Sequence, residues 1–310
     1  MIYTVTLNPA MDKTVEIPSF TIDRVNRITA IRTDPGGKGI NVSKVIQKLG
    51  GTSIAAGILG GSTGEAILSA LKAMGLESSF LFGDGETRTN LKVVDPAGHT
   101  NTDINEPGLT VSDRLMEKLL DELLAKLSSG DIVVLSGSLP KGAPADTYFT
   151  WTNACQKAGA KVILDADGDL LAAGLKASPY LIKPNNHELS RMLGETLETP
   201  EDLKKAAENL MEQYGIPMVV VSMGGDGALY VTRGKTVCAE GLKVPVGSTV
   251  GAGDSLVAAL AFALESGMAL EETVRLSTAT GAANVMCSGT QAAEYSVIRE
   301  LIPKVRFRQL

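Results

Sequence analysis

The feature that most constrains this chain is a regular alternation of short β-branched apolar runs with helical patterns over most of its 310 residues. The apolar runs predict strands at 2–7, 54–59, 132–136, 162–165, 180–183 and 218–222. Helices are predicted at 38–49, 63–74, 112–127, 145–157, 201–214 and 253–265. From residue 132 onward the strands are continuously apolar, which is typical of parallel strands covered on both faces. The pattern therefore predicts an α/β fold with a doubly wound, mainly parallel central sheet flanked by helices.

Two segments break this alternation, residues 13–34 and 87–107, where short alternating stretches are separated by turn residues such as Asp95-Pro-Ala-Gly98. These segments predict a small antiparallel β-sheet added to a main domain of residues 1–12, 35–86 and 108–310. Because a sheet of few strands is marginally stable alone, we expect it to cover the active site or to pair with another subunit.

Composition excludes several classes of protein. The net charge is -6 and no basic stripe offsets it, so nucleic acid is not expected as a partner. The three cysteines lie far apart, which argues against a disulfide framework or a zinc site. No apolar run approaches the roughly 18 residues of a membrane span, and no leader pattern is present. We expect a soluble, cytoplasmic protein with no membrane partner.

The segment 249–254 is rich in glycine and is followed at once by a strongly apolar helix. Gly251 and Gly253 leave the backbone N–H groups accessible, and the start of a helix attracts an anion. Asp254 would repel a phosphate there unless it accepts a proton from an attacking hydroxyl. This arrangement predicts phosphoryl transfer to an alcohol. The alternative is an ordinary loop in which Asp254 caps the helix.

A second glycine-rich loop, Pro35-Gly-Gly-Lys-Gly-Ile-Asn41, also opens a helix. It lacks the spacing of a Walker A loop, and the chain has no Gly-x-Gly-x-x-Gly fingerprint, which argues against a dinucleotide. Its backbone N–H groups, the Lys38 ammonium and the Asn41 amide could bind a polyhydroxylated ligand. The alternative is a tight turn with a solvated lysine.

Three charged residues near the predicted small sheet could bind a sugar phosphate. Asp12 follows the first strand and could accept hydrogen bonds from sugar hydroxyls, or cap a turn. Arg27 and Arg88 lie in or beside the small sheet, and arginine offers a planar fork for phosphate oxygens. Both could equally be solvated surface residues.

The segment Lys183-Pro-Asn-Asn-His-Glu188 joins a strand to a helix. Asn185 and Glu188 could face one hydrated Mg²⁺, which needs few protein ligands, or they could form a capping arrangement. The glycine turn at 222–227 suits a nucleotide phosphate or a tight hairpin into 228–232.

Seven short motifs follow one another along the chain: Asn8-Pro-Ala-Met-Asp12, Gly36-Gly-Lys-Gly-Ile-Asn41, Thr87-Arg-Thr-Asn90, Ser136-Gly-Ser-Leu-Pro140, Lys183-Pro-Asn185 with Glu188, Ser222-Met-Gly224 and Gly251-Ala-Gly-Asp254. In this order, and over essentially the whole chain, they resemble the ribokinase-like sugar kinases, in the phosphofructokinase B branch that phosphorylates sugar phosphates. The resemblance implies an ATP- and Mg²⁺-dependent kinase of a ketohexose phosphate. Fructose 1-phosphate, giving fructose 1,6-bisphosphate, is the first expectation, and tagatose 6-phosphate and fructose 6-phosphate are alternatives. A non-catalytic sugar-phosphate or nucleotide sensor on the same fold is the alternative from another class.

The resemblance also implies roles for individual residues. Asp254 would be the base, with Gly251, Ala252 and Gly253 as the anion hole. The sugar phosphate would contact Asp12, Arg27, Gly37, Lys38, Asn41, Arg88 and Ser138. The nucleotide would contact Lys183, Asn185, Ser222, Gly224, Gly227, Thr278 and Ala282.

The expected ions and assembly come from the same resemblance. Asn185 and Glu188 would organise Mg²⁺ through water. A K⁺ ion beside the anion hole would involve Ser248, Val250, Asn284 and Gly289. The small sheet would be a lid, and two lids would pair in a homodimer. Asp167 departs from the family pattern, where serine is usual, and this extra acid could either lower the affinity for ATP or contact the metal.

Overall fold

A computed structural model describes residues 1–310. Its large sheet contains, in spatial order, β14 (Phe307–Gln309), β13 (Lys235–Glu240), β12 (Gly227–Thr232), β11 (Met218–Ser222), β10 (Leu181–Ile182), β9 (Lys161–Asp165), β8 (Ile132–Ser136), β1 (Ile2–Thr6), β4 (Ser53–Leu59) and β5 (Glu77–Phe82). The strands from β11 to β5 run parallel, whereas β12, β13 and β14 are added in antiparallel order at one edge. The predicted α/β fold is confirmed.

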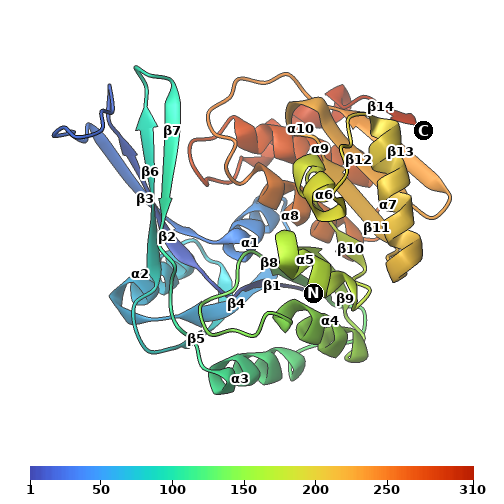
Figure 1. The fold of residues 1–310 in the computed structure, drawn as a ribbon, viewed down its shortest axis with the longest axis horizontal. Coiled ribbons are helices and arrows are strands. Elements are labelled where there is room, and N and C mark those ends of the chain that lie inside the picture. Colours follow the sequence, from blue (N-terminus) through green and yellow to red (C-terminus); the bar gives the residue numbers. More distant parts are fainter.

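Helices cover both faces of this sheet (Figure 1). One face packs against α3 (Asp113–Leu124), α4 (Thr147–Lys157), α5 (Gly168–Leu175), α6 (Asn186–Leu193) and α7 (Pro200–Tyr214). The other packs against α1 (Lys38–Lys48), α8 (Ala252–Glu265), α9 (Leu270–Val285) and α10 (Tyr295–Leu301). Helix α2 (Gly61–Ala73) lies against β4 and β5, and short 3₁₀ turns occur at η1 (Gly224–Asp226) and η2 (Ile302–Lys304).

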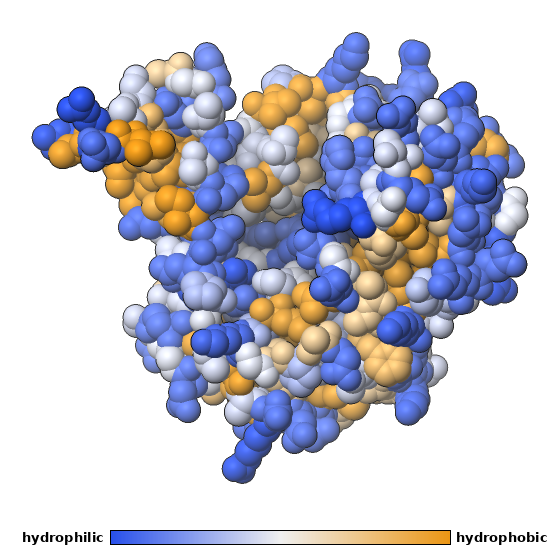
Figure 2. Space-filling model, viewed as in Figure 1, coloured by the Kyte–Doolittle hydropathy of each residue, from blue (hydrophilic) through white to orange (hydrophobic).

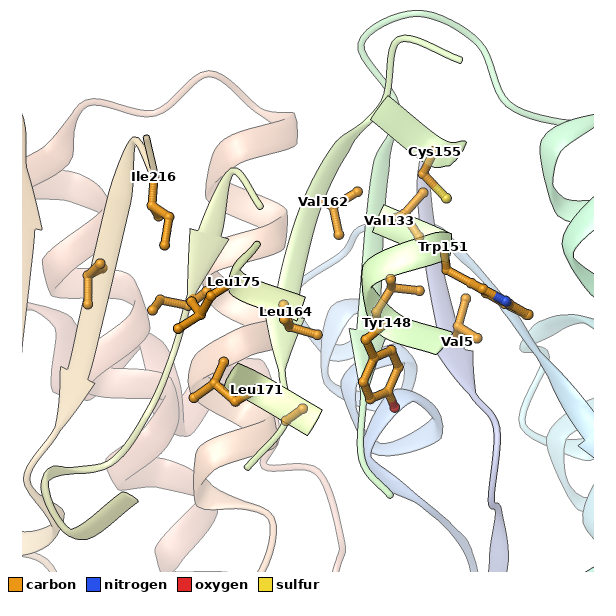
Figure 3. Packing of buried hydrophobic residues seen from close by; sticks show 14 of the residues in the cluster. Val5, Val133, Tyr148, Trp151, Cys155, Val162, Leu164, Leu171, Leu175 and Ile216 are labelled. Carbon is orange, nitrogen blue, oxygen red and sulfur yellow. The ribbon is translucent and has the colours of Figure 1, made fainter. Parts of the chain in front are cut away.

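Successive residues of the central strands enter opposite cores, as the two-residue repeat of a strand requires. Val133 belongs to the first core and Val134 to the second. Figure 3 shows the first core, where Tyr148 and Trp151 of α4 lie beside Val133. Burial on both faces explains why these strands are continuously apolar in the sequence.

Each predicted strand and helix of the main domain corresponds to an element, with ends that differ by a few residues. The strand expected at 180–183 shrinks to β10 because Pro184 follows it and lacks a backbone N–H. The elements β5, β13, β14, α5, α9 and α10 were not among the predictions. None of the helices has both the length and the apolar character needed to cross a membrane.

The small sheet, here called the lid, stands apart from the main sheet (Figure 1). Its spatial order is β3 (Ala30–Gly36), β2 (Ala10–Glu16), β6 (Arg88–Asp95) and β7 (Thr100–Asn105). The pairs β2/β3 and β6/β7 are antiparallel as expected, but β2 and β6 run parallel. The expectation of a wholly antiparallel sheet was therefore wrong at its centre. The reason is that β2 and β6 are joined through β3, α1, β4, α2 and β5, which permits a parallel crossover, rather than through a hairpin turn.

Candidate active site

A cavity of about 460 Å³ lies between the lid and the carboxyl ends of the parallel strands, and only two of the 22 residues that line it, Leu91 and Val250, are hydrophobic. In Figure 2 the hollow at the centre of the molecule is lined by hydrophilic residues. Ten of the residues predicted from the sequence line it: Asp12, Gly37, Lys38, Asn41, Arg88, Ser138, Val250, Gly251, Asp254 and Gly289. The other residues of the wall are Thr6, Asn8, Thr14, Asn90, Leu91, Lys92, Asp103, Asn105, Ser136, Gly137, Asp167 and Thr290.

Asp254 lies in the first turn of α8 and is buried. The helix is capped by Gly251, whose φ of 81° favours glycine, so Asp254 is not the cap residue. Asn41 Nδ2 donates a hydrogen bond of 2.8 Å to Asp254 Oδ2. The backbone N–H groups of Gly253 and Asp254 have no acceptor within the chain, as expected at a helix start. A buried carboxylate and two free N–H donors thus lie in the first turn of the same helix.

Burial raises the pKa of Asp254 above its ordinary value, although the nearby Lys38 ammonium opposes the shift. A neighbouring carboxylate, Asp165, raises it further. A carboxylate with a raised pKa is a stronger base, which suits Asp254 to accept a proton from an alcohol.

Asp165, at the end of β9, holds two lysines beside this base. Lys38 Nζ lies 3.2 Å from one carboxylate oxygen of Asp165, and Lys183 Nζ lies 3.4 Å from the other. Burial opposes the charge on Asp165, but the two ammonium groups outweigh it and hold the pKa of Asp165 below its ordinary value. The pKa values of Asp165 and Asp254 are therefore displaced in opposite directions, which favours Asp254 over Asp165 as a proton acceptor near neutral pH.

Lys183 also faces the start of α8. A Cβ added at Gly253 would lie 3.5 Å from Lys183 Nζ. The Lys183 ammonium therefore lies beside the first turn of α8, where the free N–H groups are. The sequence indicated that Asp165 lies at the end of a strand but did not reveal its ion pairs with Lys183 and Lys38. These lysines follow other strands, β10 and β3, and are brought to Asp165 only by the fold.

Asp12 lies on β2 and lines the cavity beside the end of β3. A Cβ added at Gly36 would lie 2.1 Å from Asp12 Oδ2, so only glycine leaves room for this carboxylate. Asn90 Nδ2 donates a hydrogen bond of 3.1 Å to Asp12 Oδ1 across the parallel pair of strands. Burial raises the pKa of Asp12, and the hydrogen bond from Asn90 opposes the shift. The carboxylate can accept further hydrogen bonds from hydroxyl groups.

The structure separates the two arginines that were predicted together. Arg88 lies in the cavity wall, where its fork donates hydrogen bonds to Asn8 O at 2.9 Å and to Glu106 O at 3.2 Å. Two of its N–H groups are thereby occupied, and others remain for a ligand. Arg27 is exposed in the loop between β2 and β3, at the far end of the lid, and does not line the cavity of this chain (Figure 1).

The predicted nucleotide residues near β10 and β11 lie close together. Asn185 and Glu188 form a capping box, with both hydrogen bonds at 2.8 Å, so the capping interpretation is confirmed. Ser222 lies beside Asn185, and a Cβ at Gly224 would meet nothing within 4 Å. Gly227 instead serves the hairpin, because its added Cβ would lie 2.0 Å from a carbonyl oxygen of β13.

Three other expected nucleotide or metal residues occupy different surroundings. Thr278 is buried on α9, where its hydroxyl lies 3.0 Å from the hydroxyl of Tyr230. Neither Thr278 nor Ala282 lines the cavity. Asp167, the residue that departs from the family pattern, lines the cavity and makes no capping hydrogen bond at the start of α5.

The segment expected to hold K⁺ contains two buried side-chain oxygens without a hydrogen-bond partner, Asn284 Oδ1 at the end of α9 and Thr290 Oγ1 in the loop that follows. Two carbonyl groups nearby each accept one hydrogen bond. Ser288 O accepts a hydrogen bond of 2.7 Å from Arg32, and Thr290 O accepts one of 3.0 Å from Lys44.

The doubly wound fold, the open helix start, the buried Asp254 carboxylate and the paired lysines are features that phosphoryl transfer to an alcohol requires, and the family match given next shows a phosphotransferase. The chain belongs to the pfkB family of carbohydrate kinases, whose sequence model matches residues 6–296. This confirms the family expected from the seven motifs.

Individual relatives agree with the family assignment. The chain is 38% identical to 1-phosphofructokinase of Bacillus subtilis, with all of both chains covered. It is 41% identical to 1-phosphofructokinase of Rhodobacter capsulatus over 90% of this chain and 88% of that one. Among solved structures, phosphofructokinase-2 of Escherichia coli in complex with potassium has a TM-score of 0.93 at 34% identity, with 98% of each chain covered.

Proposed function

We propose that this chain transfers the γ-phosphoryl group of ATP to fructose 1-phosphate and forms fructose 1,6-bisphosphate. The observation that carries the proposal is Asp254, a buried base in the first turn of α8 between a polar cavity and the Lys183 ammonium. The relatives named 1-phosphofructokinase support fructose 1-phosphate as the acceptor. Tagatose 6-phosphate and fructose 6-phosphate are the alternative acceptors.

The chemistry follows from the free atoms of the site. Asp254 Oδ2 accepts from Asn41, which leaves Oδ1 to accept the proton of the sugar hydroxyl. The hydroxyl oxygen forms a bond to the γ-phosphorus, while the bond from that phosphorus to the oxygen bridging the β-phosphate breaks, and ADP leaves with the electron pair. The expected anion hole was Gly251, Ala252 and Gly253, but the N–H of Ala252 donates to Thr249 O at 3.4 Å. The N–H groups of Gly253 and Asp254, with Lys183, would therefore stabilise the charge on the transferring group.

The donor set near α6 fits a hydrated magnesium ion. The capping box leaves Glu188 Oε1 free, and no group of three His, Cys, Asp or Glu side chains forms a dedicated metal cage. Mg²⁺ typically keeps several waters and binds one or two carboxylates together with substrate phosphates. Glu188 and Asn185 would hold it through water, and the bound ion would neutralise part of the phosphate charge.

A monovalent cation is supported by the partnerless Oδ1 of Asn284, close to Gly251. The potassium complex of the related phosphofructokinase-2 agrees with this proposal. The remaining ligands would come from the backbone near Ser248 and Val250 and from Gly289.

The lid also carries apolar side chains that suit a second copy of this chain. Ile22 and Val25 are 86% and 84% exposed, and Ile28, Ile31 and Ile104 are more than half exposed. Figure 2 shows this apolar patch over the lid at the upper left. Contiguous exposed apolar surface of this kind marks interaction sites, and we propose a homodimer formed through the lid.

The three cysteines are unpaired, which fits the reducing cytoplasm.

The test measures ADP release with Mg²⁺-ATP and a panel of fructose 1-phosphate, fructose 6-phosphate, tagatose 6-phosphate, fructose and ribose. We expect the highest kcat/KM with fructose 1-phosphate. Asp254→Asn should retain ATP binding and lose about 10²–10⁴-fold in kcat, the usual contribution of a general base. The exposed Asp121→Asn on α3 is the control and should change nothing.

The outcomes separate the alternatives. A preference for another ketohexose phosphate would keep the mechanism and replace the acceptor. Near-wild-type turnover by Asp254→Asn would remove this residue from the reaction. ATP binding without turnover of any sugar would favour the non-catalytic sensor.

A further inference from the structure

The inner face of the lid presents two rows of polar side chains that cross all four strands. The paired positions from β3 to β7 are Arg32, Thr14, Lys92 and Asp103 in one row, and Asp34, Asp12, Asn90 and Asn105 in the next. All of these except Arg32 and Asp34 line the cavity. The second row contains Asp12, which is expected from the family resemblance to contact the sugar. The first row lies one strand repeat further out and has no assigned role.

Lys92 is the cation of this first row that lines the cavity. Every second residue of β6 lies on the same face of the lid, and on the cavity side these residues are Arg88, Asn90 and Lys92. The Cα atoms of Arg88 and Lys92 are about 13 Å apart at the usual rise per residue of a strand. Because both side chains are long, they can converge on an anion that lies over Asn90.

The partners of these cations differ in how readily they can be replaced. Lys38 is held by the buried Asp165, and Arg88 donates to two backbone carbonyl groups. Lys92 has one partner, Asp103 Oδ1 at 2.7 Å. The Lys92 side chain is 14% exposed, whereas Asp103 is 52% exposed. Asp103 can therefore rotate into water while the ammonium stays in the cavity wall.

We propose that Lys92 binds the phosphate group of the sugar substrate, and that Asp103 pairs with the Lys92 ammonium until substrate arrives. The inference rests on the proposed function and extends it to the substrate's phosphate. That phosphate lies over Asn90 between Arg88 and Lys92, and the sugar extends past Asp12 toward Asp254. A phosphate monoester carries nearly two negative charges at neutral pH and so replaces the single, half-exposed carboxylate.

The test compares Lys92→Met, Lys92→Arg and Asp103→Asn with the wild type. The control is Lys118→Met, which removes an exposed, ion-paired lysine on α3, far from the lid. The Kd of fructose 1-phosphate, fructose 6-phosphate and tagatose 6-phosphate is measured by calorimetry without ATP, so the result does not depend on turnover. KM and kcat are then measured for the sugar that binds most tightly.

Lys92→Met should weaken binding of that sugar phosphate about tenfold or more, as expected for the loss of a charge-assisted hydrogen bond. The KM for ATP and kcat should stay within about twofold. Lys92→Arg should restore most of the affinity, and Asp103→Asn should tighten binding because the competing carboxylate is gone. A purely structural role would give no rescue by arginine and no tightening by Asp103→Asn.

An unchanged Kd for all three sugar phosphates in Lys92→Met would overturn the proposal, as would equal losses in Lys92→Met and Lys92→Arg. These results are distinguishable from failure of the proposed function. A wild type that binds sugar phosphate but never releases ADP would contradict the kinase activity alone, and the calorimetry would still decide the role of Lys92.

Discussion

Replacing Asp165 by asparagine tests how strongly the site depends on a buried anion. Asparagine has nearly the same shape, so packing is retained and only the charge is lost. Lys183 is 6% exposed and would be left as an unpaired buried cation, a change that typically costs about 3–5 kcal/mol. Lys38 is 37% exposed, so water screens its charge, and its ion pair with Asp165 adds little to the free energy of unfolding. We therefore expect Asp165→Asn to lose about 3–5 kcal/mol of unfolding free energy, nearly all through Lys183.

Urea unfolding of the wild type, Asp165→Asn, Lys183→Met and the double variant measures this directly. Since residues in contact are coupled, the double variant should be clearly less destabilised than the sum of the single variants. The two lysines lower the pKa of Asp165 in the folded state. Its contribution is therefore complete above the unfolded pKa of about 3.9 and is lost as pH falls through the folded value. The difference between wild type and Asp165→Asn should narrow below about pH 4.

A destabilisation below about 1 kcal/mol, the value of an ordinary surface pair, would refute the argument that this ion pair is buried and essential. Strict additivity in the double variant would equally show that Asp165 and Lys183 do not interact in solution.

Three further predictions follow from the same geometry. Gly253→Ala should keep the protein folded, with a change in unfolding free energy within about 1 kcal/mol, because alanine favours a helix. The added methyl group enters the space beside Lys183, so the rate of ADP release should fall at least about tenfold. A fully active variant would contradict the proposed anion hole. In a plot of kcat/KM against pH, activity should fall at low pH with an apparent pKa above about 3.9, because burial raises the pKa of Asp254. The residual activity of Asp254→Asn should not show this fall. Burial raises the pKa of the Cys155 thiol to about 12, so alkylation of the native protein should spare Cys155, and its rapid modification would show that α4 opens.

The main domain was predictable because its strands are covered on both faces and therefore need apolar residues at successive positions, which appear as continuous apolar runs in the sequence. The run 218–222 matches β11 at both ends for this reason. Strands whose burial depends on partners far away in the sequence show a weaker pattern of apolar residues. The edge strand β14, for example, is partly exposed and pairs with β13 far from it in sequence.

Local chemistry in the sequence also determined which residues could act. Asp254 follows a glycine turn and precedes a helix, so the start of α8 and its acid were evident without coordinates. The capping box of Asn185 and Glu188 was similarly visible as a three-residue spacing.

The tertiary structure alone decided how these parts interact. The parallel pairing of β2 with β6 places Asp12 against Asn90 and puts Lys92 in the cavity wall, although Asp12 and Lys92 are far apart in the chain. The pairing of Asp165 with Lys183 joins the ends of neighbouring strands. Sequence patterns report which residues are apolar, charged or flexible at short range. Burial of a charged group and its distance from other charges together decide the direction of its pKa shift, and both arise only when the strands are assembled side by side.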